Sequence, residues 1–390
     1  MPVDVFVVKG ADAAQNAYEA MSRVFDEDAS QLSILLKVNS GFKGKPATGL
    51  CTHPEAVRGL VRFFKEKHVK KLYVGDSSIV GTDTIEALKS VGIWQVCEEE
   101  GIECLNLDDS GIQERDIPDP VMVERLKLSR LAFVVDRVVS VPVMKTHMYA
   151  GASLSIKNMK GCLYQRDKTR LHRIVKPLPE NARGKCLDYG IMDLAKICYA
   201  DYALVDGTIA MEGFGPSGGT PVEMDLAVAS KSPVAADIVS LRLMGMEPGD
   251  APHIDLVREN KGLDESDIRV FPEDYLKWAK RFVRAGEQDL GLHYPQFSTL
   301  DRGACSACHA AVLQFFRYHH ADFPDKGHIT IACGSDLKEE ELRAAAAEGE
   351  VVLVGNCTAR FRDSYPFCKG CPPVPSQIKR TIEGGKTYDD

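Results

Sequence analysis

Apolar and polar residues alternate along the first 300 positions in blocks that predict strands and helices in turn. Residues 3–8 form an apolar run typical of a first strand. From 53 to 64 the apolar residues recur at helical spacing, a strand-like run follows at 72–74, and a second helical pattern runs through 85–88. This rhythm predicts an α/β fold, with a mixed, largely parallel sheet and helices on both faces.

Three further runs have strand character. They lie at 131–135, at 138–144 with Pro142 as an interruption or strand end, and at 202–205, which we expect to stop in a turn at Asp206-Gly207. The segment 213–221 is rich in glycine and proline, which predicts a loop, one that could cover a site.

The C-terminal part repeats the α/β pattern on a smaller scale. A helical pattern around residues 312–316 precedes a strand at 328–332 that ends at Cys333, and a second strand at 351–354 leads to Cys357. We therefore predict a main α/β domain over 1–270, a linker over 271–300 and a small cysteine-rich α/β module over 301–390.

Composition and charge limit the class of protein. The 390 residues are 44% hydrophobic and 27% charged, with a net charge of -8 and a pI near 5.8, whereas a nucleic-acid-binding protein would be basic. No apolar run approaches the roughly 20 residues of a membrane span, and residues 1–8 lack the pattern of a signal peptide. We expect a cytoplasmic protein that binds neither nucleic acid nor membrane. A homodimer is the commonest assembly for such a chain.

Six of the twelve cysteines lie between Cys305 and Cys371. Thiols stay reduced in the cytoplasm, so a group of cysteines there favours a metal centre or catalysis over disulfides. Two pairs have two-residue spacing, and two single cysteines follow predicted strands, so that all would meet at one edge of a small sheet. The predicted ligands of a [4Fe–4S] cluster are Cys305, Cys308, Cys357 and Cys371, with Cys368 and Cys333 as alternates.

Two other uses of these cysteines compete with the cluster. Structural zinc would use the pairs that begin at Cys305 and Cys368 as two knuckles, but a zinc ribbon closes its loop within about 15–20 residues. Here the gap from Cys308 to Cys368 contains two predicted strands. The third alternative is a set of unligated or redox-active thiols. The full ferredoxin run, with three cysteines at two-residue spacing, is not present in the sequence.

A second group of candidate residues is basic. Lys145 and His147 alternate onto one face if the strand before them continues that far. Lys157 and Lys160, which flank Asn158, share a helical face at i,i+3 spacing. Ser153 would cap that helix, whose N-terminal amides favour an anion. The pattern predicts a pocket for a carboxylate, phosphate or sulfonate. The alternative is a set of solvated lysines, but their neighbours are small or apolar rather than charged.

Three other residues complete the candidate site. His172, flanked by arginines, would add to the positive pocket, or it is a structural or surface histidine. Asp206 at a strand end and Glu212 before the glycine-rich loop would supply carboxylates for proton transfer, alongside Lys145, His147 and Lys157 as catalytic candidates. Ordinary acidic turn residues are the alternative for both carboxylates.

Several of these motifs together resemble a known family. The sequence reads VPVMKTH at 141–147, SIKNMKG at 155–161, VDG at 205–207 and MEGFGP at 211–216, and Asp237 fits the continuation. This combination resembles the DUF362 family over roughly residues 30–260. The resemblance implies a cytoplasmic iron–sulfur protein of a kind common in anaerobic bacteria and archaea and often joined to an iron–sulfur module. It implies no reaction. The spaced C-terminal cysteines depart from the ferredoxin-type domain of many members.

Two classes of function follow from these patterns. In the first, the chain is an iron–sulfur oxidoreductase that binds a small anion and exchanges electrons with a redox partner protein. If one cysteine is not a ligand, an open iron would instead serve a lyase or desulfurase as a Lewis acid. In the second, the chain is a non-enzymatic electron carrier or an assembly factor for a cluster or metal. A zinc-stabilised binding protein is a further alternative.

Overall fold

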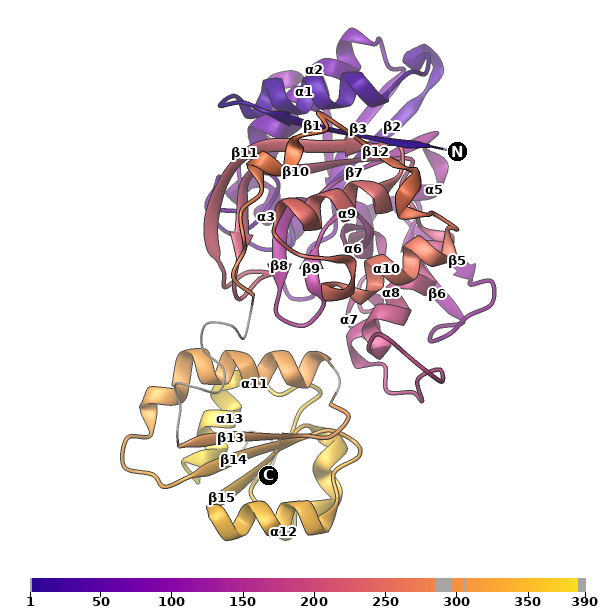
Figure 1. Ribbon diagram of the computed structural model, residues 1–390. Coiled ribbons are helices and arrows are strands. Elements are labelled where there is room, and N and C mark those ends of the chain that lie inside the picture. The colour runs from indigo at the N-terminus through magenta and orange to yellow at the C-terminus, as the bar shows by residue number, and fades with distance from the viewer. Residues whose placement is uncertain (1, 285–295, 305, 385–390) are drawn as a thin grey trace. The chain divides into compact units, whose positions relative to one another are not determined.

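The computed structural model describes residues 2–284, 296–304 and 306–384, and the side chains of Ser306 and Ala307 are not part of that description. The chain divides into two compact units (Figure 1). The main unit comprises residues 1–171 and 179–285, and the second unit comprises 172–178 and 286–390.

The main unit is built on a ten-stranded sheet in the described residues. The order along the sheet is β12 (Ile268–Phe271), β1 (Val3–Lys9), β11 (Thr220–Ser230), β10 (Tyr202–Glu212), β7 (Arg137–Val141), β2 (Ser33–Val38), β3 (Lys71–Asp76) and β4 (Glu103–Asn106). β8 (Val143–His147) branches from β10 and pairs with β9 (Gly151–Ser153). Pairs β1–β11, β10–β11 and β8–β9 are antiparallel and the others parallel, which confirms the predicted mixed sheet.

Helices cover both faces of this sheet (Figure 1). Ile34, Leu36 and Val38 of β2 belong to one hydrophobic core with the apolar residues of α1 (Ala13–Val24) and α2 (Pro54–Glu66). Strand side chains alternate between faces, so Lys37 points to the opposite layer, where α6 (Ser155–Asn158) lies. α2 begins as the sequence predicts, with Pro54 in its first turn and the His53 ring accepting a hydrogen bond from the Glu55 N–H at 3.2 Å.

The main unit contains further helices and strands. They are α3 (Thr84–Ser90), α4 (Ile93–Glu100), β5 (Ile112–Asp116), β6 (Arg125–Ser129), α5 (Leu131–Val134), α7 (Asp167–Arg170), α8 (Cys186–Ile197), α9 (Pro233–Leu243) and α10 (Pro252–Asn260). β5 and β6 form a separate antiparallel pair.

Two local predictions are wrong. Residues 131–134 form the short helix α5 rather than a strand, and Val134 is 56% exposed. The place beside β2 is taken instead by β7, so Pro142 separates β7 from β8 as a strand end. The predicted turn at Asp206-Gly207 is also wrong, because β10 continues to Glu212 with a register shift between Gly207 and Ile209. The segment 213–219 connects β10 to β11 as a hairpin.

The second unit contains a four-stranded parallel sheet in the order β13 (Phe297–Asp301), β14 (Ile329–Cys333), β15 (Glu350–Val354) and β16 (Phe367–Cys368). Its helices are α11 (Ser306–His319), α12 (Glu339–Glu348) and α13 (Pro375–Ile382). Residues of α11 and α13 share one hydrophobic core with the sheet, and those of α12 share another. The predicted strands that lead to Cys333 and Cys357 are confirmed. β13 falls within the segment predicted as a linker.

Candidate functional site

The main sheet changes direction between β2 and β7. From β2 the chain runs outward through β3 to β4, whereas β7 lies on the other side of β2. The carboxyl ends of parallel strands at such a point frame a crevice that open α/β folds use for ligands. Thr52 closes the loop after β2 onto the end of β7: its N–H donates to Asn39 O at 2.9 Å and its hydroxyl to Val141 O at 2.7 Å.

The predicted lysine segment lies across these two strand ends. It consists of α6 followed by a 3₁₀ turn, Met159–Cys162. The buried Asn158 side chain holds it there, since its amide donates to Lys37 O of β2 at 2.8 Å and to the Ser140 hydroxyl of β7 at 3.1 Å. Asn158, predicted as a substrate-binding residue, therefore fixes the segment to the sheet.

A buried ion pair that the sequence reasoning missed lies beneath this segment. Lys37 Nζ is 2.6 Å from Asp76 Oδ1, and it donates to Asn158 Oδ1 at 3.1 Å. Asp76 also accepts from the backbone N–H groups of Ser40 at 2.6 Å and Ser77 at 2.8 Å. The signal was a lysine inside an apolar strand and an aspartate at the end of the next one. Lysine and aspartate side chains are almost never fully buried unless they are paired, and here each is the partner of the other.

The start of α6 corrects another prediction. Ser153 does not cap the helix; the buried carboxylate of Asp237 on α9 accepts from the N–H of Ser155 at 2.7 Å and of Ile156 at 2.8 Å. Burial raises the pKa of Asp237 to about 8, and the two backbone donors oppose the rise. The hydrogen-bond acceptor at this helix start is therefore a side chain of the protein itself.

Three predicted lysines gather beside the strand ends. Lys145 Nζ donates to Asn39 Oδ1 at 2.8 Å and to Leu50 O at 2.9 Å, and burial lowers its pKa to about 8. Burial lowers the pKa of Lys160 to about 7. Burial, together with repulsion from Lys160 and Lys145, lowers the pKa of Lys157 well below its usual value, although the residue is partly exposed.

When its members are protonated, this lysine cluster (Lys145, Lys157 and Lys160) concentrates positive charge. Within the described part of the chain, neither Lys145 nor Lys157 has a carboxylate at ion-pair distance, and Lys157 Nζ reaches only the Ser153 hydroxyl at 3.5 Å. Burying like charges together is unfavourable unless an opposite charge joins them. The arrangement is therefore suited to an anion, as the sequence predicts.

His147 lies on β8 with Lys145, and both side chains are buried. Its Nδ1 accepts from the N–H of Tyr149 and of Ala150, both at 3.1 Å, so the proton of the neutral ring is on Nε2. The ring lines a pocket of about 340 Å³ together with Lys185 and Arg284, and the lysine cluster does not line this pocket. His147 and the lysine cluster thus face different spaces.

The two predicted carboxylates have structural partners. The buried Asp206 accepts from the N–H of His53 at 2.7 Å and of Thr208 at 2.9 Å. Glu212 accepts from the N–H of Val283 at 2.8 Å. Both carboxylates fix backbone segments. Their role in proton transfer stays a prediction. His172 falls in the segment 172–178, which groups with the second unit.

The described cysteines of the second unit lie toward one end of its sheet. Cys333 and Cys368 are the last residues of the parallel strands β14 and β16, and both are buried. Cys357 and Cys371 follow in exposed loops. Asn356 joins those loops, since its N–H donates to Gly370 O and its side chain accepts from Gly370 N–H, both at 2.9 Å.

Cys308 reaches the same end of the sheet. It is buried, and a Cβ placed on Gly355 would lie 2.7 Å from its sulfur. Cys305 lies outside the described residues. Among the residues that are described, no three or more His, Cys, Asp or Glu side chains lie close enough together to hold a metal ion. The ligand set therefore stays a prediction.

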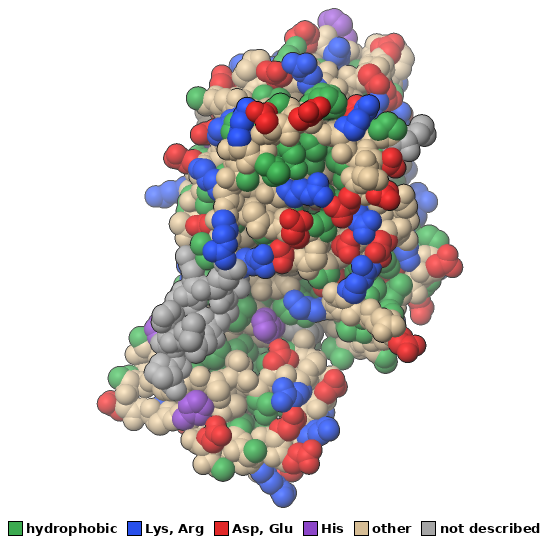
Figure 2. Space-filling model, in the orientation of Figure 1, with side chains coloured by type: hydrophobic (Ala, Val, Ile, Leu, Met, Phe, Trp, Pro, Cys, Tyr) green, Lys and Arg blue, Asp and Glu red, His purple; other side chains and the backbone are tan. Residues whose placement is uncertain are grey.

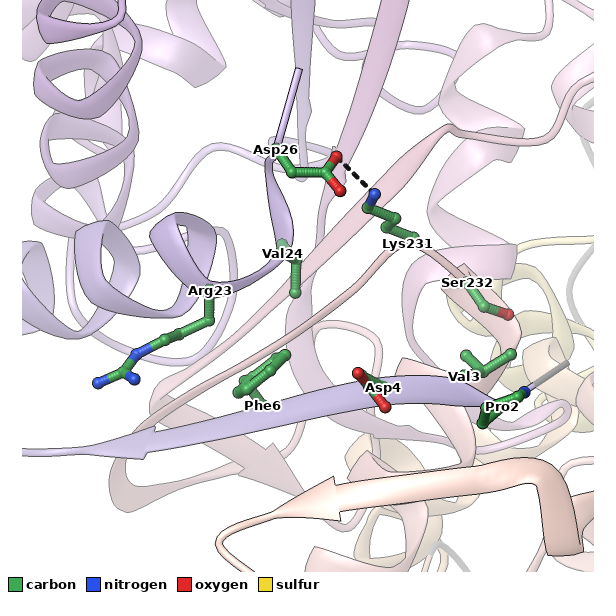
Figure 3. A pocket seen from close by; sticks show the side chains of 9 residues that line it. All are labelled: Pro2, Val3, Asp4, Phe6, Arg23, Val24, Asp26, Lys231 and Ser232. Atoms are coloured by element: carbon green, nitrogen blue, oxygen red, sulfur yellow. Dashed lines mark hydrogen bonds and ion pairs between the residues drawn. The ribbon is translucent and has the colours of Figure 1, made fainter.

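A second hollow of the main unit lies between β1 and the segment around Asp26 (Figure 3). Its volume is about 360 Å³. Asp26 and Lys231 form an ion pair across it at 2.5 Å, and Asp4 pairs with Arg269 at 2.7 Å. These charges neutralise one another, so this hollow lacks the excess charge of the lysine cluster.

The outer surface is mixed in charge. Figure 2 shows Lys and Arg side chains interspersed with Asp and Glu over the face of the main unit that it presents. Among the described residues, no helix is both long and apolar enough to cross a bilayer.

Comparisons with known proteins agree with the family resemblance. Residues 34–242 match the profile of DUF362, a domain of unknown function. A thylakoid-associated protein of Synechocystis sp. is 28% identical over 236 residues, which cover 59% of this chain and 68% of that protein. The lactate racemase apoprotein of Thermoanaerobacterium thermosaccharolyticum aligns in structure with a TM-score of 0.43 and 11% identity, over 90% of this chain and 82% of the other. A Thermotoga maritima protein aligns with a TM-score of 0.38 and 9% identity, over 98% and 93%. The matched profile runs from β2 into α9 and so includes the lysine cluster.

Proposed function

Because the chain belongs to the DUF362 family, whose reaction its description leaves open, we propose its function from the site itself: it is a cytoplasmic iron–sulfur oxidoreductase that binds a small anion. The observation that carries the proposal is the lysine cluster at the strand ends. Lys145, Lys157 and Lys160 lie close together and their pKa values are lowered. A bound carboxylate or phosphate would stabilise their protonated forms against both desolvation and mutual repulsion.

The roles of the chain's own residues follow from their contacts. Lys145 is held at Asn39 and Leu50 O, which fixes one positive charge in place. Lys157 and Lys160 lie on the segment that Asn158 fastens to the sheet, so their backbone is fixed as well. A lysine with a pKa near 7 can also give up a proton at neutral pH, and Lys160 is the cluster's candidate for that role.

The residues of the second unit are chemically suited to an iron–sulfur cluster. The four thiolates that would hold it are Cys305, Cys308, Cys357 and Cys371, with Cys368 and Cys333 as alternates. Cys308 lies beside Gly355, and the next residue, Asn356, is hydrogen-bonded to Gly370 in the loop that carries Cys371. Such a cluster, when bound, supplies single-electron transfer, and a redox partner protein would exchange those electrons. Zinc is the alternative occupant of the same thiolates.

Two measurements test the proposal separately. The first is anaerobic purification of the full chain followed by iron, sulfide and zinc analysis. We expect about four irons and about four sulfides per chain, whereas one zinc without sulfide would contradict the cluster.

The second measurement is calorimetric titration with inorganic phosphate at pH 7. The variant Lys157→Ala should weaken binding about tenfold or more, the typical loss when a charged hydrogen-bonding group is removed. Lys231→Ala, which removes an exposed lysine that pairs with Asp26, is the matched control and should bind as the wild type does. Unchanged binding by Lys157→Ala would contradict the anion site.

A further inference from the structure

A buried acid–base pair, Asp188 and His253, lies next to the lysine cluster and is joined only by a long contact. Asp188 is 1% exposed and His253 is 0% exposed. Oδ1 of Asp188 and both ring nitrogens of His253 have no hydrogen-bond partner within the described residues. Nδ1 of the ring lies 3.5 Å from Oδ1, beyond a good hydrogen bond.

The packing of three helices brings this pair to the lysines. α8, which carries Asp188 in its first turn, packs against α10, which carries His253, and it also contacts α6 and the 3₁₀ turn that follows α6. The charges interact. Burial lowers the pKa of His253, Asp188 opposes this fall, and Lys157 and Lys160 add to it. Asp188 likewise opposes the fall in the pKa of Lys157.

Buried polar atoms without partners are rare, and each one needs an explanation such as a water, an ion or a ligand. Three such atoms gather here beside an excess of positive charge. The other oxygen of Asp188 is engaged, since it accepts from the N–H of Lys185 at 2.9 Å. The orphaned oxygen is therefore held in place and can only accept a hydrogen bond.

We propose that Asp188 and His253 form the polar wall of the anion site and select anions that carry a hydrogen-bond donor. This inference rests on the proposed anion site. The lysines attract negative charge, but an anion without a proton would place its oxygens against the Asp188 carboxylate and be repelled. An anion with an O–H group donates to Asp188 Oδ1 and accepts from the ring N–H of His253. The substrate class is thus a protonated oxyanion or an anion that bears a hydroxyl group.

The probes are inorganic phosphate and sulfate, titrated calorimetrically into the full chain at pH 7 and equal ionic strength. The two are similar in shape and charge, but phosphate keeps at least one O–H at this pH and sulfate has none. We expect phosphate to bind about 10- to 100-fold more tightly, the effect of one hydrogen bond to a charged group. This comparison uses the wild-type protein and needs no variant to fold.

Variants then identify the residue responsible. Asp188→Asn keeps an acceptor for Lys185 N–H but can offer a donor to the ligand, so the preference for phosphate should fall to within about threefold or reverse. Asp255→Asn removes a carboxylate from the same helix as His253, where it pairs with Arg258 at 2.7 Å, and should leave the preference unchanged. Equal binding of both anions by the wild type, or an unchanged preference in Asp188→Asn, would overturn this inference and leave the anion site standing. Binding of neither anion would overturn the anion site as well.

Discussion

Replacing Gly161 by alanine should loosen the buried Lys37–Asp76 pair and destabilise the main unit. Gly161 lies in the 3₁₀ turn that follows α6. A Cβ at this position would lie 2.5 Å from Lys37 Nζ and 2.6 Å from its Cε, and closer still to Asp76 Oδ1. Real Cβ contacts are longer than 3.0 Å, so the pair must move. Both partners are buried and cannot turn toward solvent.

The size of the effect follows from two costs and one gain. Overpacking a filled site costs about 1–3 kcal/mol. Breaking a buried ion pair outright costs about 3–5 kcal/mol, and a displaced pair loses part of that. Alanine returns about 0.4–1 kcal/mol, because Gly161 does not have a positive φ and the unfolded chain becomes less flexible. We expect a net loss of about 2–4 kcal/mol in the free energy of unfolding.

The assay is urea unfolding followed by circular dichroism, with phosphate titration of the folded variant. Gly249→Ala is the matched control, since Gly249 also lies in a 3₁₀ turn, has no positive φ and has no atom within 4 Å of its added Cβ. Its unfolding free energy should stay within about 0.5 kcal/mol of the wild type. An equally small change for Gly161→Ala would refute the claim that Gly161 packs directly against the Lys37–Asp76 pair.

Three further outcomes follow from the structure. Phosphate affinity should fall as pH rises from 6 to 9, by about tenfold per unit above 7 and more steeply above 8, because Lys160 and Lys145 lose protons near 7 and 8. The same lowered pKa values mean that the unfolded chain binds more protons, so the unfolding free energy of the ligand-free protein should rise with pH from about 7 toward 10. Asp237→Ala should cost about 2–4 kcal/mol, because two buried N–H donors lose their acceptor. Gly355→Ala should displace Cys308 and reduce the iron bound per chain.

Each of these outcomes has a control. Sodium chloride at constant pH separates the titration of the lysines from general screening, and a pH-independent phosphate affinity would contradict their lowered pKa values. For Asp237→Ala, hydrogen exchange of Ser155 and Ile156 amides should accelerate, and unchanged exchange would contradict the contact. Gly384→Ala is matched to Gly355→Ala because both glycines have a positive φ and nothing lies within 4 Å of the Cβ added at Gly384; equal iron content in the two variants would contradict the position of Cys308.

Local patterns predicted much of the fold. The helix after His53, the strand β3 and the strands β14 and β15 of the second unit all follow from periodicity and short-range signals. The segment 131–135 shows the limit of that reasoning. It is as apolar as a buried strand, but the place beside β2 is filled by β7, and only the competition between two segments for one neighbour decides which becomes the strand.

The sequence was enough to predict the lysines of the site, but not the side chains that lie next to them in the fold. Lys145, Lys157 and Lys160 were found because they are basic residues among apolar ones, and the structure brings them together. Asp188 and His253 are separated from them in sequence and carry no local signal, since their proximity depends on how α8 and α10 pack. The cap at α6 was assigned to Ser153 by adjacency, whereas a carboxylate 82 residues away provides it.

The contact of Asn158 with β2 and β7 has a kinetic consequence. Asn158 lies 121 residues from Lys37 along the chain, so the contact forms only after a long loop has closed and β7 has found its place beside β2. Pairings of such high contact order form slowly. During refolding, helix content should therefore return before the ability to bind an anion, and the delay between them would time the docking of the lysine segment onto the sheet.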